Sequence, residues 1–157
     1  MSTRILIVGF GNPLAADDGA GPAVVARLLE MSPPAWVRCE DGGSDSLRLP
    51  TLWRGEQDVW LVDAVARGTP PGSIHRLDHE GVMSVPQRHA TVHHLSLPES
   101  LRWIAIAYPE MAHVRYRFWG IEITRVSLQP GLSPVVAAAV ESVVSELLDE
   151  SRLPHLR

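Results

Sequence analysis

The chain has 157 residues, of which 45% are hydrophobic and 20% are charged, and its formal net charge is -4. This length suits one domain with a sizeable core, and this apolar content argues against intrinsic disorder. The net negative charge argues against a nucleic-acid-binding protein. No segment is long and apolar enough to span a membrane. The single Cys39 cannot form an internal disulfide, which fits a reducing cytoplasm.

Strand patterns alternate with helical patterns through the first half of the chain. The run "ILIV" is typical of a strand buried on both faces, and "DVWLVD" is a similar strand that ends on the carboxylate of Asp63. In chain order we predict a strand over 5–8, a helix over 19–31, a strand over 36–40, a short helix over 46–53 and a strand over 58–63.

The second half begins with "ARGTPPG", whose glycine and proline content indicates a turn. Ser133 and Pro134 have the residue types of an N-cap and of a first helical position, so a helix should begin there. Between them we predict an edge strand over 73–78, an irregular loop over 79–91, a helix over 97–108 and a strand over 113–123. We expect residues 1–150 to form a single domain and residues 151–157 to form a loose tail.

This order of elements predicts a three-layer α/β/α fold. A mostly parallel, mixed and twisted sheet of about five strands should carry helices on both faces. Ligands of such sheets bind in the crevice outside the carboxyl ends of the strands. The residues directly after Val8, Glu40 and Val62 are therefore the strongest candidates for functional residues.

The loop after the first strand reads "GFGNPLAADDGAG" and invites comparison with a nucleotide site. Gly9 and Gly11 permit a tight turn, but Leu14 stands where a dinucleotide fingerprint needs its third glycine. Asp17 and Asp18 would repel a pyrophosphate, so dinucleotide binding is disfavoured. Either aspartate alone could cap the following helix, which would leave a spare carboxylate at this edge of the sheet.

Asp63 should lie at the same edge, where it could accept N–H bonds of the next turn or join a metal site. His93 and His94 precede a helix and could be an exposed pair, or one of them could reach the carboxylates. Carboxylates and imidazole suit Mn, Fe, Ni or Zn, and an open set of three ligands would suit a catalytic or substrate-binding metal. Gly42 and Gly43 could shape a groove or simply form a turn.

Five stretches of the chain, in this order, resemble the nickel–iron hydrogenase maturation endopeptidases. They are "GFGNPLAADDGAG", "DGGS", "VWLVDAV", "HHLSL" and "GLSPVV". The first matches a specific motif, Gly-x-Gly-Asn-x-Leu-x-x-Asp-Asp/Glu-x-x-Gly, and the shorter ones add weight by their order. The resemblance runs over nearly the whole chain.

This resemblance implies a cytoplasmic protease that removes a short C-terminal extension from the precursor of a hydrogenase large subunit after nickel has been inserted. It also implies that the precursor's nickel is recognised by an acid of the first motif, an aspartate ending a later strand and a histidine near a helix start. By motif these roles fall on Asp18, Asp63 and His93. Asp17 is a rival for the acid, and His94 for the histidine.

The resulting hypothesis is a nickel-dependent, aspartic-type endopeptidase whose pocket contacts nickel already held by the substrate's cysteines. Asp17 or Asp18 would be the catalytic base, and Gly42 and Gly43 would let the extended tail approach the backbone. Cd or Zn could stand in for nickel in the isolated protein. Two alternatives stay open, a non-catalytic nickel-binding maturation chaperone and, less favoured, a small nucleotide- or flavin-binding module.

Overall fold

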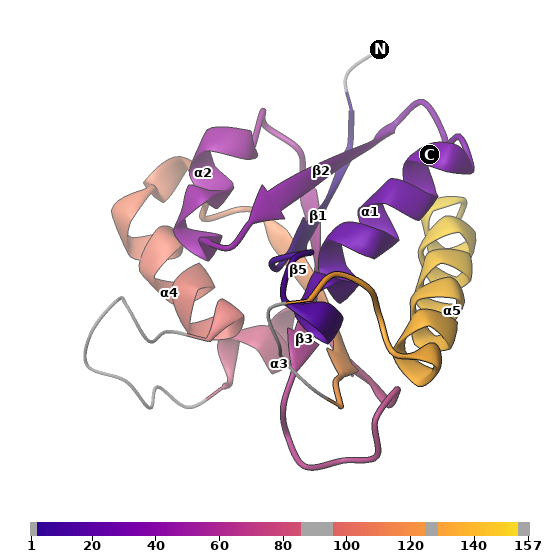
Figure 1. Ribbon diagram of the computed structural model, residues 1–157. Coiled ribbons are helices and arrows are strands. Elements are labelled where there is room, and N and C mark those ends of the chain that lie inside the picture. Colours follow the sequence, from indigo (N-terminus) through magenta and orange to yellow (C-terminus); the bar gives the residue numbers. More distant parts are fainter. Residues whose placement is uncertain (1–2, 86–95, 125–128, 154–157) are drawn as a thin grey trace.

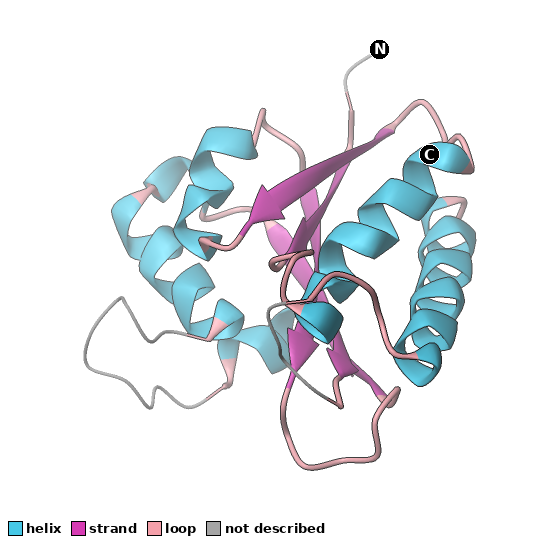
Figure 2. Ribbon diagram, viewed as in Figure 1, coloured by secondary structure: helices cyan, strands magenta, loops and turns pink. Residues whose placement is uncertain are grey.

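A five-stranded sheet forms the centre of the molecule, and helices cover both of its faces (Figures 1 and 2). The structure is a computed structural model that describes residues 3–85, 96–124 and 129–153. The strand order is β2-β1-β3-β5-β4, with parallel pairing throughout except for the antiparallel edge strand β4. The predicted three-layer α/β/α fold with a mixed sheet is confirmed.

The described elements follow the predicted order, with one additional short helix. The strands are β1 (Ile5–Phe10), β2 (Val37–Gly43), β3 (Asp58–Val65), β4 (Ile74–Leu77) and β5 (Arg115–Glu122). The α-helices are α1 (Ala20–Glu30), α2 (Leu49–Leu52), α3 (His79–Met83), α4 (Leu97–Ala107) and α5 (Pro134–Ser151). Short 3-10 turns are η1 (Ala16–Gly19), η2 (Ser46–Arg48) and η4 (Pro109–Met111).

Two hydrophobic cores lie on opposite faces of the sheet, because successive side chains of a strand point to opposite faces. Ile5 and Ile7 of β1 pack with α1 and α5, whereas Leu6 and Val8 pack with α2, α3 and α4. Figure 1 shows α1 and α5 together on one side of the sheet and α2 and α4 on the other. Because each fully buried aliphatic side chain stabilises by about 1.5–3 kcal/mol, both helical layers are held by burial.

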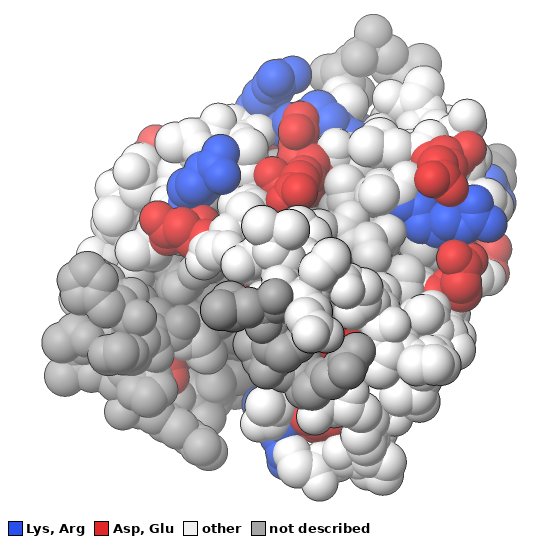
Figure 3. All heavy atoms as spheres, viewed as in Figure 1, with Lys and Arg blue, Asp and Glu red and all other residues white. Residues whose placement is uncertain are grey.

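Acidic and basic side chains lie next to one another on the face drawn in Figure 3. Between the helices of one layer, Arg27 of α1 pairs with Glu141 of α5 at 3.1 Å. An exposed pair of this kind contributes only about 0–1 kcal/mol, so it supplements the apolar core between these helices. Within the described residues, no helix has the length and apolarity needed to cross a membrane.

Several predicted element boundaries were wrong; β1, for example, continues two residues past Val8 to Phe10. β2 continues through Gly43, where a loop was expected after residue 40, because its pairing with β1 extends to Phe10 opposite Gly43. β3 continues two residues past Asp63 to Val65, which pairs with Glu122 of β5. Residues 79–83 form helix α3 instead of an irregular loop. Ser151, the first residue of the predicted loose tail, instead ends helix α5 and is buried. Residues 154–157 lie outside the described residues, so the looseness of that part stays a prediction.

Candidate functional site

The first loop turns sharply because glycines in and beside it leave room for the backbones of α1 and β1 to lie in contact. A Cβ on Gly9 would lie 2.2 Å from the carbonyl oxygen of Gly21, a distance that real Cβ atoms do not adopt. Gly11 has a φ of +140°, and a Cβ there would lie 2.0 Å from the carbonyl oxygen of Asp18. This close packing places η1, with its two aspartates, at the carboxyl end of β1.

The Asp17 side chain is fully buried and holds together two segments that are distant in sequence. Its Oδ1 accepts a hydrogen bond from the Ser133 amide at 2.7 Å, and its Oδ2 accepts one from the Ser133 hydroxyl at 2.9 Å. Oδ2 also accepts hydrogen bonds from the Thr124 amide and hydroxyl. Burial raises the pKa of Asp17, but these hydrogen bonds outweigh burial and hold the pKa below its ordinary value. Asp17 thus anchors η1 to the start of α5.

Ser133 does stand at the predicted N-cap position of α5, but its side chain makes no capping hydrogen bond. The hydroxyl donates instead to Asp17. Sequence reasoning missed this pairing and the role of Thr124. Thr124 and Ser133 are hydroxyl residues that could donate to a carboxylate, but no local sequence pattern indicates that either of them contacts η1.

Unlike the enclosed side chain of Asp17, the Asp18 side chain faces a cavity. It lines a cavity of about 190 Å³ beside Gly11 and Phe10, at the carboxyl ends of the strands. Its Oδ2 accepts a hydrogen bond from the Asn12 amide at 2.8 Å, which fixes the carboxylate in the loop. Asp63 lines the same cavity, so the structure brings together two of the residues predicted to recognise a metal.

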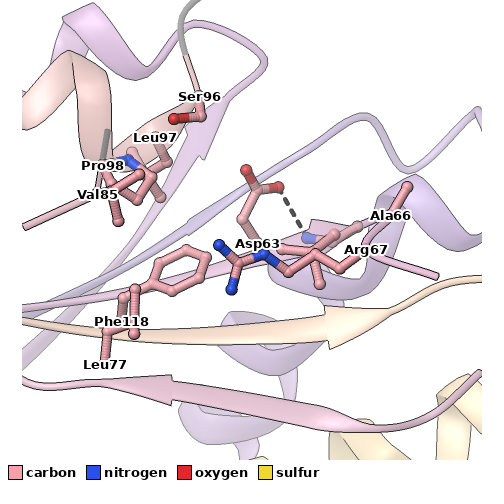
Figure 4. A pocket seen from close by; sticks show the side chains of 11 residues that line it. Asp63, Ala66, Arg67, Leu77, Val85, Ser96, Leu97, Pro98 and Phe118 are labelled. Atoms are coloured by element: carbon pink, nitrogen blue, oxygen red, sulfur yellow. Dashed lines mark hydrogen bonds between the residues drawn. The ribbon is translucent and has the colours of Figure 1, made fainter. Parts of the chain in front are cut away.

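Asp63 reaches this cavity from β3, which lies between β1 and β5 in the sheet. Its Oδ1 accepts a hydrogen bond from the Ala64 amide at 2.8 Å, drawn as the dashed line in Figure 4. Burial raises the pKa of the Asp63 carboxyl to about 7, although the Ala64 hydrogen bond opposes the shift, and the negative charge of Asp18 adds to it. The carboxyl can therefore gain or lose a proton near neutral pH, which is the property of a functional acid.

Gly42 and Gly43 end β2 beside the first loop. A Cβ on Gly42 would lie 2.4 Å from a ring carbon of Phe10, so this glycine makes room for a packed aromatic ring. Gly43 has a φ of +68°, and its carbonyl oxygen accepts a hydrogen bond from the Gly11 amide at 2.9 Å. The structure gives both glycines a role in joining β2 to the first loop, and their contact with a peptide stays a prediction.

Sequence reasoning also missed three serines of the cavity. Ser44 and Ser46 follow β2, and Ser96 precedes α4, and all three line the cavity that contains Asp18 and Asp63. The Ser46 hydroxyl donates to the Ser100 hydroxyl at 2.7 Å, which ties η2 to α4 at this point. Hydroxyl groups beside two carboxylates make the cavity polar. No sequence signal separates these serines from ordinary turn and cap residues.

His93 and His94, the predicted imidazole ligands, lie outside the described residues. Over residues 3–85, 96–124 and 129–153, no group of three or more His, Cys, Asp and Glu side chains is placed to hold a metal ion. The two carboxylates of the cavity are oxygen ligands suited to a divalent metal that brings other ligands with it. The third predicted contact, from His93, stays a prediction.

The cavity favours acid–base chemistry with carboxylates over attack by a thiol. Cys39 is buried in the core of the α1 face, and burial raises the pKa of its thiol to about 12, which makes it a poor nucleophile. Asp18 and Asp63 share one cavity, and the raised pKa of Asp63 lets its carboxyl exchange a proton near neutral pH. Two carboxyls that meet in one cavity can divide the roles of base and acid.

A sequence model of the hydrogenase maturation protease family matches residues 22–150. A Methanocaldococcus jannaschii protein named as a hydrogenase maturation protease is 32% identical over 148 residues, which cover 93% of this chain and 95% of that protein. The hydrogenase 2 maturation protease of Escherichia coli K12 is 26% identical over 151 residues, covering 92% of this chain and 88% of that protein.

Solved structures show the same relationship at the level of the fold. A nickel–iron hydrogenase maturation protease from Thermococcus kodakarensis aligns with a TM-score of 0.77 and 25% identity, over 96% of this chain and all of that one (100%). A hydrogenase maturating endopeptidase from E. coli aligns with a TM-score of 0.78 and 24% identity, over 96% of this chain and 93% of that chain. The sheet and helices described above are thus those of known maturation proteases.

Proposed function

This chain belongs to the hydrogenase maturation protease family, and on that premise we propose that it removes the C-terminal extension of a hydrogenase large-subunit precursor after nickel insertion. The precursor's nickel is the recognition signal in this proposal. Asp18, Asp63 and His93 contact it from the protease side. The observation that carries the proposal is the meeting of the Asp18 and Asp63 carboxylates in one cavity at the carboxyl ends of the strands.

Nickel reaches the cavity as part of the substrate. In the precursor it is held by cysteine thiolates, and hard carboxylate oxygens and an imidazole can complete a coordination sphere that thiolates leave open. Asp18 is fixed for this role by the Asn12 amide, and Asp63 by the Ala64 amide. A nickel ion that approaches Asp63 favours its ionised form, so the proton leaves the carboxyl as the precursor docks.

Cleavage then requires an activated water and a polarised carbonyl at the scissile bond. A metal held in the substrate supplies a Lewis acid for that carbonyl. A carboxylate of the cavity takes the proton of the attacking water, and Asp18 is better placed for this than Asp17. The carboxylate of Asp17 is enclosed by Ser133 and Thr124, and Asp17 does not line the cavity.

The proposed partner is therefore a hydrogenase large-subunit precursor, and the proposed site of action is the cytoplasm, where nickel insertion takes place. Among the relatives, the T. kodakarensis protein is named for nickel–iron hydrogenase, which agrees with nickel as the recognised metal. Leu14, at the position of the third glycine of a dinucleotide fingerprint, disfavours the nucleotide- and flavin-binding alternative.

The proposal is tested by incubating the purified protein with nickel-loaded and nickel-free precursor and following the mass of the large subunit. We expect the C-terminal extension to be released from the nickel-loaded form only. Equal release from both forms would contradict the role of nickel as the recognition signal. Tight nickel binding by the isolated protein with no cleavage of either precursor would favour the maturation chaperone instead.

A further inference from the structure

A second cavity adjoins the one that contains the two carboxylates. Its volume is about 280 Å³, and it shares Asp63, Ser96 and Leu97 with the smaller cavity. Figure 4 shows Asp63 on one side of it, the start of α4 across from Asp63, and Phe118 and Leu77 along the strands. The two cavities therefore form one continuous depression with a polar end at Asp18 and a larger end beyond Asp63.

The larger end is lined mainly by apolar side chains. Leu77 comes from β4, Phe118 from β5, Val85 from the residues after α3, and Leu97 and Pro98 from the first turn of α4. On the other side lie the residues from Asp63 to Arg67. A concave apolar wall beside a small number of polar groups is typical of a site that takes an apolar ligand group.

One wall of this cavity is fixed by a buried carboxylate. The segment after β3 carries Ala66 and Arg67, and the Arg67 amide donates to both carboxylate oxygens of Glu122, at 3.0 and 2.9 Å. The Thr69 hydroxyl and amide donate to the same carboxylate. Glu122 is only 2% exposed, so its hydrogen bonds hold the segment firmly against β5. The cavity is therefore a built feature with a stable shape.

We propose that this apolar cavity is a specificity subsite that binds one apolar side chain of the precursor, close in sequence to the scissile bond. The inference rests on the proposed function and deepens it. The cavity begins at Asp63, so a peptide whose nickel is contacted by Asp18 and Asp63 has its neighbouring side chains within reach of Phe118 and Leu97. The nickel then signals that the precursor is loaded, and the apolar side chain selects where the chain is cut.

The expected selectivity follows from the chemistry of the walls. Removing apolar area from water favours binding by about 25 cal/mol per Å², and a hydrophobic pocket discriminates by about 10–200-fold per methylene. The subsite should therefore accept leucine- or methionine-sized side chains and bind alanine less well.

The test uses nickel-loaded precursors in which each apolar residue near the cut is changed in turn to Ala or Leu. Cleavage rates are measured with the wild type, with Ala66→Trp, which fills the exposed mouth of the cavity, and with Ala138→Trp. Ala138 is an exposed alanine of α5 that does not line the cavity, so it provides the matched control. Thermal unfolding of each variant shows that it is folded.

At one substrate position, we expect Ala to slow wild-type cleavage by at least about 10-fold relative to Leu, and Ala66→Trp to shift the preference from Leu towards Ala. The Ala138→Trp variant should keep the wild-type preference. A ratio of rates is independent of how much variant enzyme is folded. Wild-type indifference to every substitution, or an unchanged preference in Ala66→Trp, would overturn the subsite while leaving the proposed function intact. Failure of the wild type on the unaltered nickel-loaded precursor would overturn the proposed function and the subsite with it.

Discussion

Asp17 and Asp18 are adjacent in the chain, yet their carboxylates meet different neighbours. Asp17 turns inward and accepts hydrogen bonds from Thr124 and Ser133, whereas Asp18 lines the cavity with Asp63. The 3-10 geometry of η1 and the positive φ of Ala16 (52°) allow the two side chains to diverge over so short a distance. Asp17 therefore holds the loop in place, and Asp18 faces the cavity.

At the residue scale, this division predicts that Asp17→Ala destabilises the fold. The substitution removes the fully buried carboxylate that accepts hydrogen bonds from Thr124 and Ser133, which should lower the free energy of unfolding by about 1–3 kcal/mol. Urea unfolding monitored by circular dichroism measures the difference. Asp149→Ala, at an exposed position of α5, is the control and should change the stability by less than about 0.5 kcal/mol. Equal stabilities of the two variants would contradict the anchoring role.

The raised pKa of Asp63 predicts a pH-dependent effect of Asp63→Asn. The folded protein holds a proton on Asp63 up to about pH 7, whereas the unfolded chain releases it near the ordinary value of 3.8. Wild-type stability should therefore fall as pH rises between these values, relative to a variant that cannot ionise there.

We expect Asp63→Asn to match the wild type near pH 4 and to exceed its free energy of unfolding by more than about 1 kcal/mol at pH 8, since one pKa unit corresponds to about 1.4 kcal/mol. Urea unfolding at both pH values, with Asp149→Asn for comparison, measures this. A variant that is less stable than the wild type at pH 8 would show that the ionised carboxylate is favourable in the fold.

Much of the site could be predicted from sequence, for a physical reason. Asp18 follows β1 and Asp63 lies near the end of β3, and parallel neighbours bring such residues to one edge. The division of labour between Asp17 and Asp18 could not be predicted, because the partners of Asp17 lie 107 and 116 residues away in the sequence. The raised pKa of Asp63 depends on the depth of the cavity, which no local pattern encodes.

At the scale of elements, the contact between α1 and β1 sets the position of the first loop. Gly9 in the strand and Gly21 in the helix face each other, and neither has room for a Cβ. The motif glycines that first suggest a phosphate loop are therefore needed for backbone packing. Leu14, which stands where a dinucleotide fingerprint needs glycine, is 65% exposed and does not line the carboxylate cavity.

Gly21→Ala should separate α1 from β1. The added methyl group would lie 2.2 Å from the Phe10 carbonyl oxygen and 2.8 Å from that of Val62, and neither backbone group can move away freely. We expect a loss of at least about 2 kcal/mol of unfolding free energy, measured by urea titration.

Gly81→Ala is the matched helical control for this substitution. Its added Cβ would meet the Asp78 side chain at 3.2 Å, and alanine is the better helix former, so its stability should change little. If Gly21→Ala proves as stable as Gly81→Ala, the close contact is not what holds α1 in place.

Element boundaries were predicted less well than element order. The predicted end of β2 was too early because aspartate and glycine are rare in strands. In the structure, pairing with β1 extends β2 through Gly43. Helix α3 was missed because five residues give too little periodicity to recognise; it is stabilised by the Asp78 side chain, which accepts from the Gly81 amide at 2.8 Å. Both errors arise where tertiary contacts outweigh local propensity.

At the scale of the whole molecule, the sheet topology explains why one cavity combines a carboxylate pair with an apolar extension. β1 and β3 are neighbours and supply the acidic end, whereas β5 and β4 continue the sheet on the other side of β3 and supply Phe118 and Leu77. Helix α4 closes both ends through Ser96 and Leu97. A precursor laid across these strands would meet the two carboxylates and the apolar walls in succession.

The most direct test is the initial rate of cleavage of nickel-loaded precursor by Asp18→Asn and Asp63→Asn, measured from the mass of the large subunit. Asn keeps the size of each side chain and removes the charge, and Asp149→Asn controls for the loss of a carboxylate elsewhere. The two-carboxylate account predicts that each site variant is folded and cleaves at least about 10-fold more slowly than the wild type, while the control is unaffected. Wild-type rates in both site variants would contradict it.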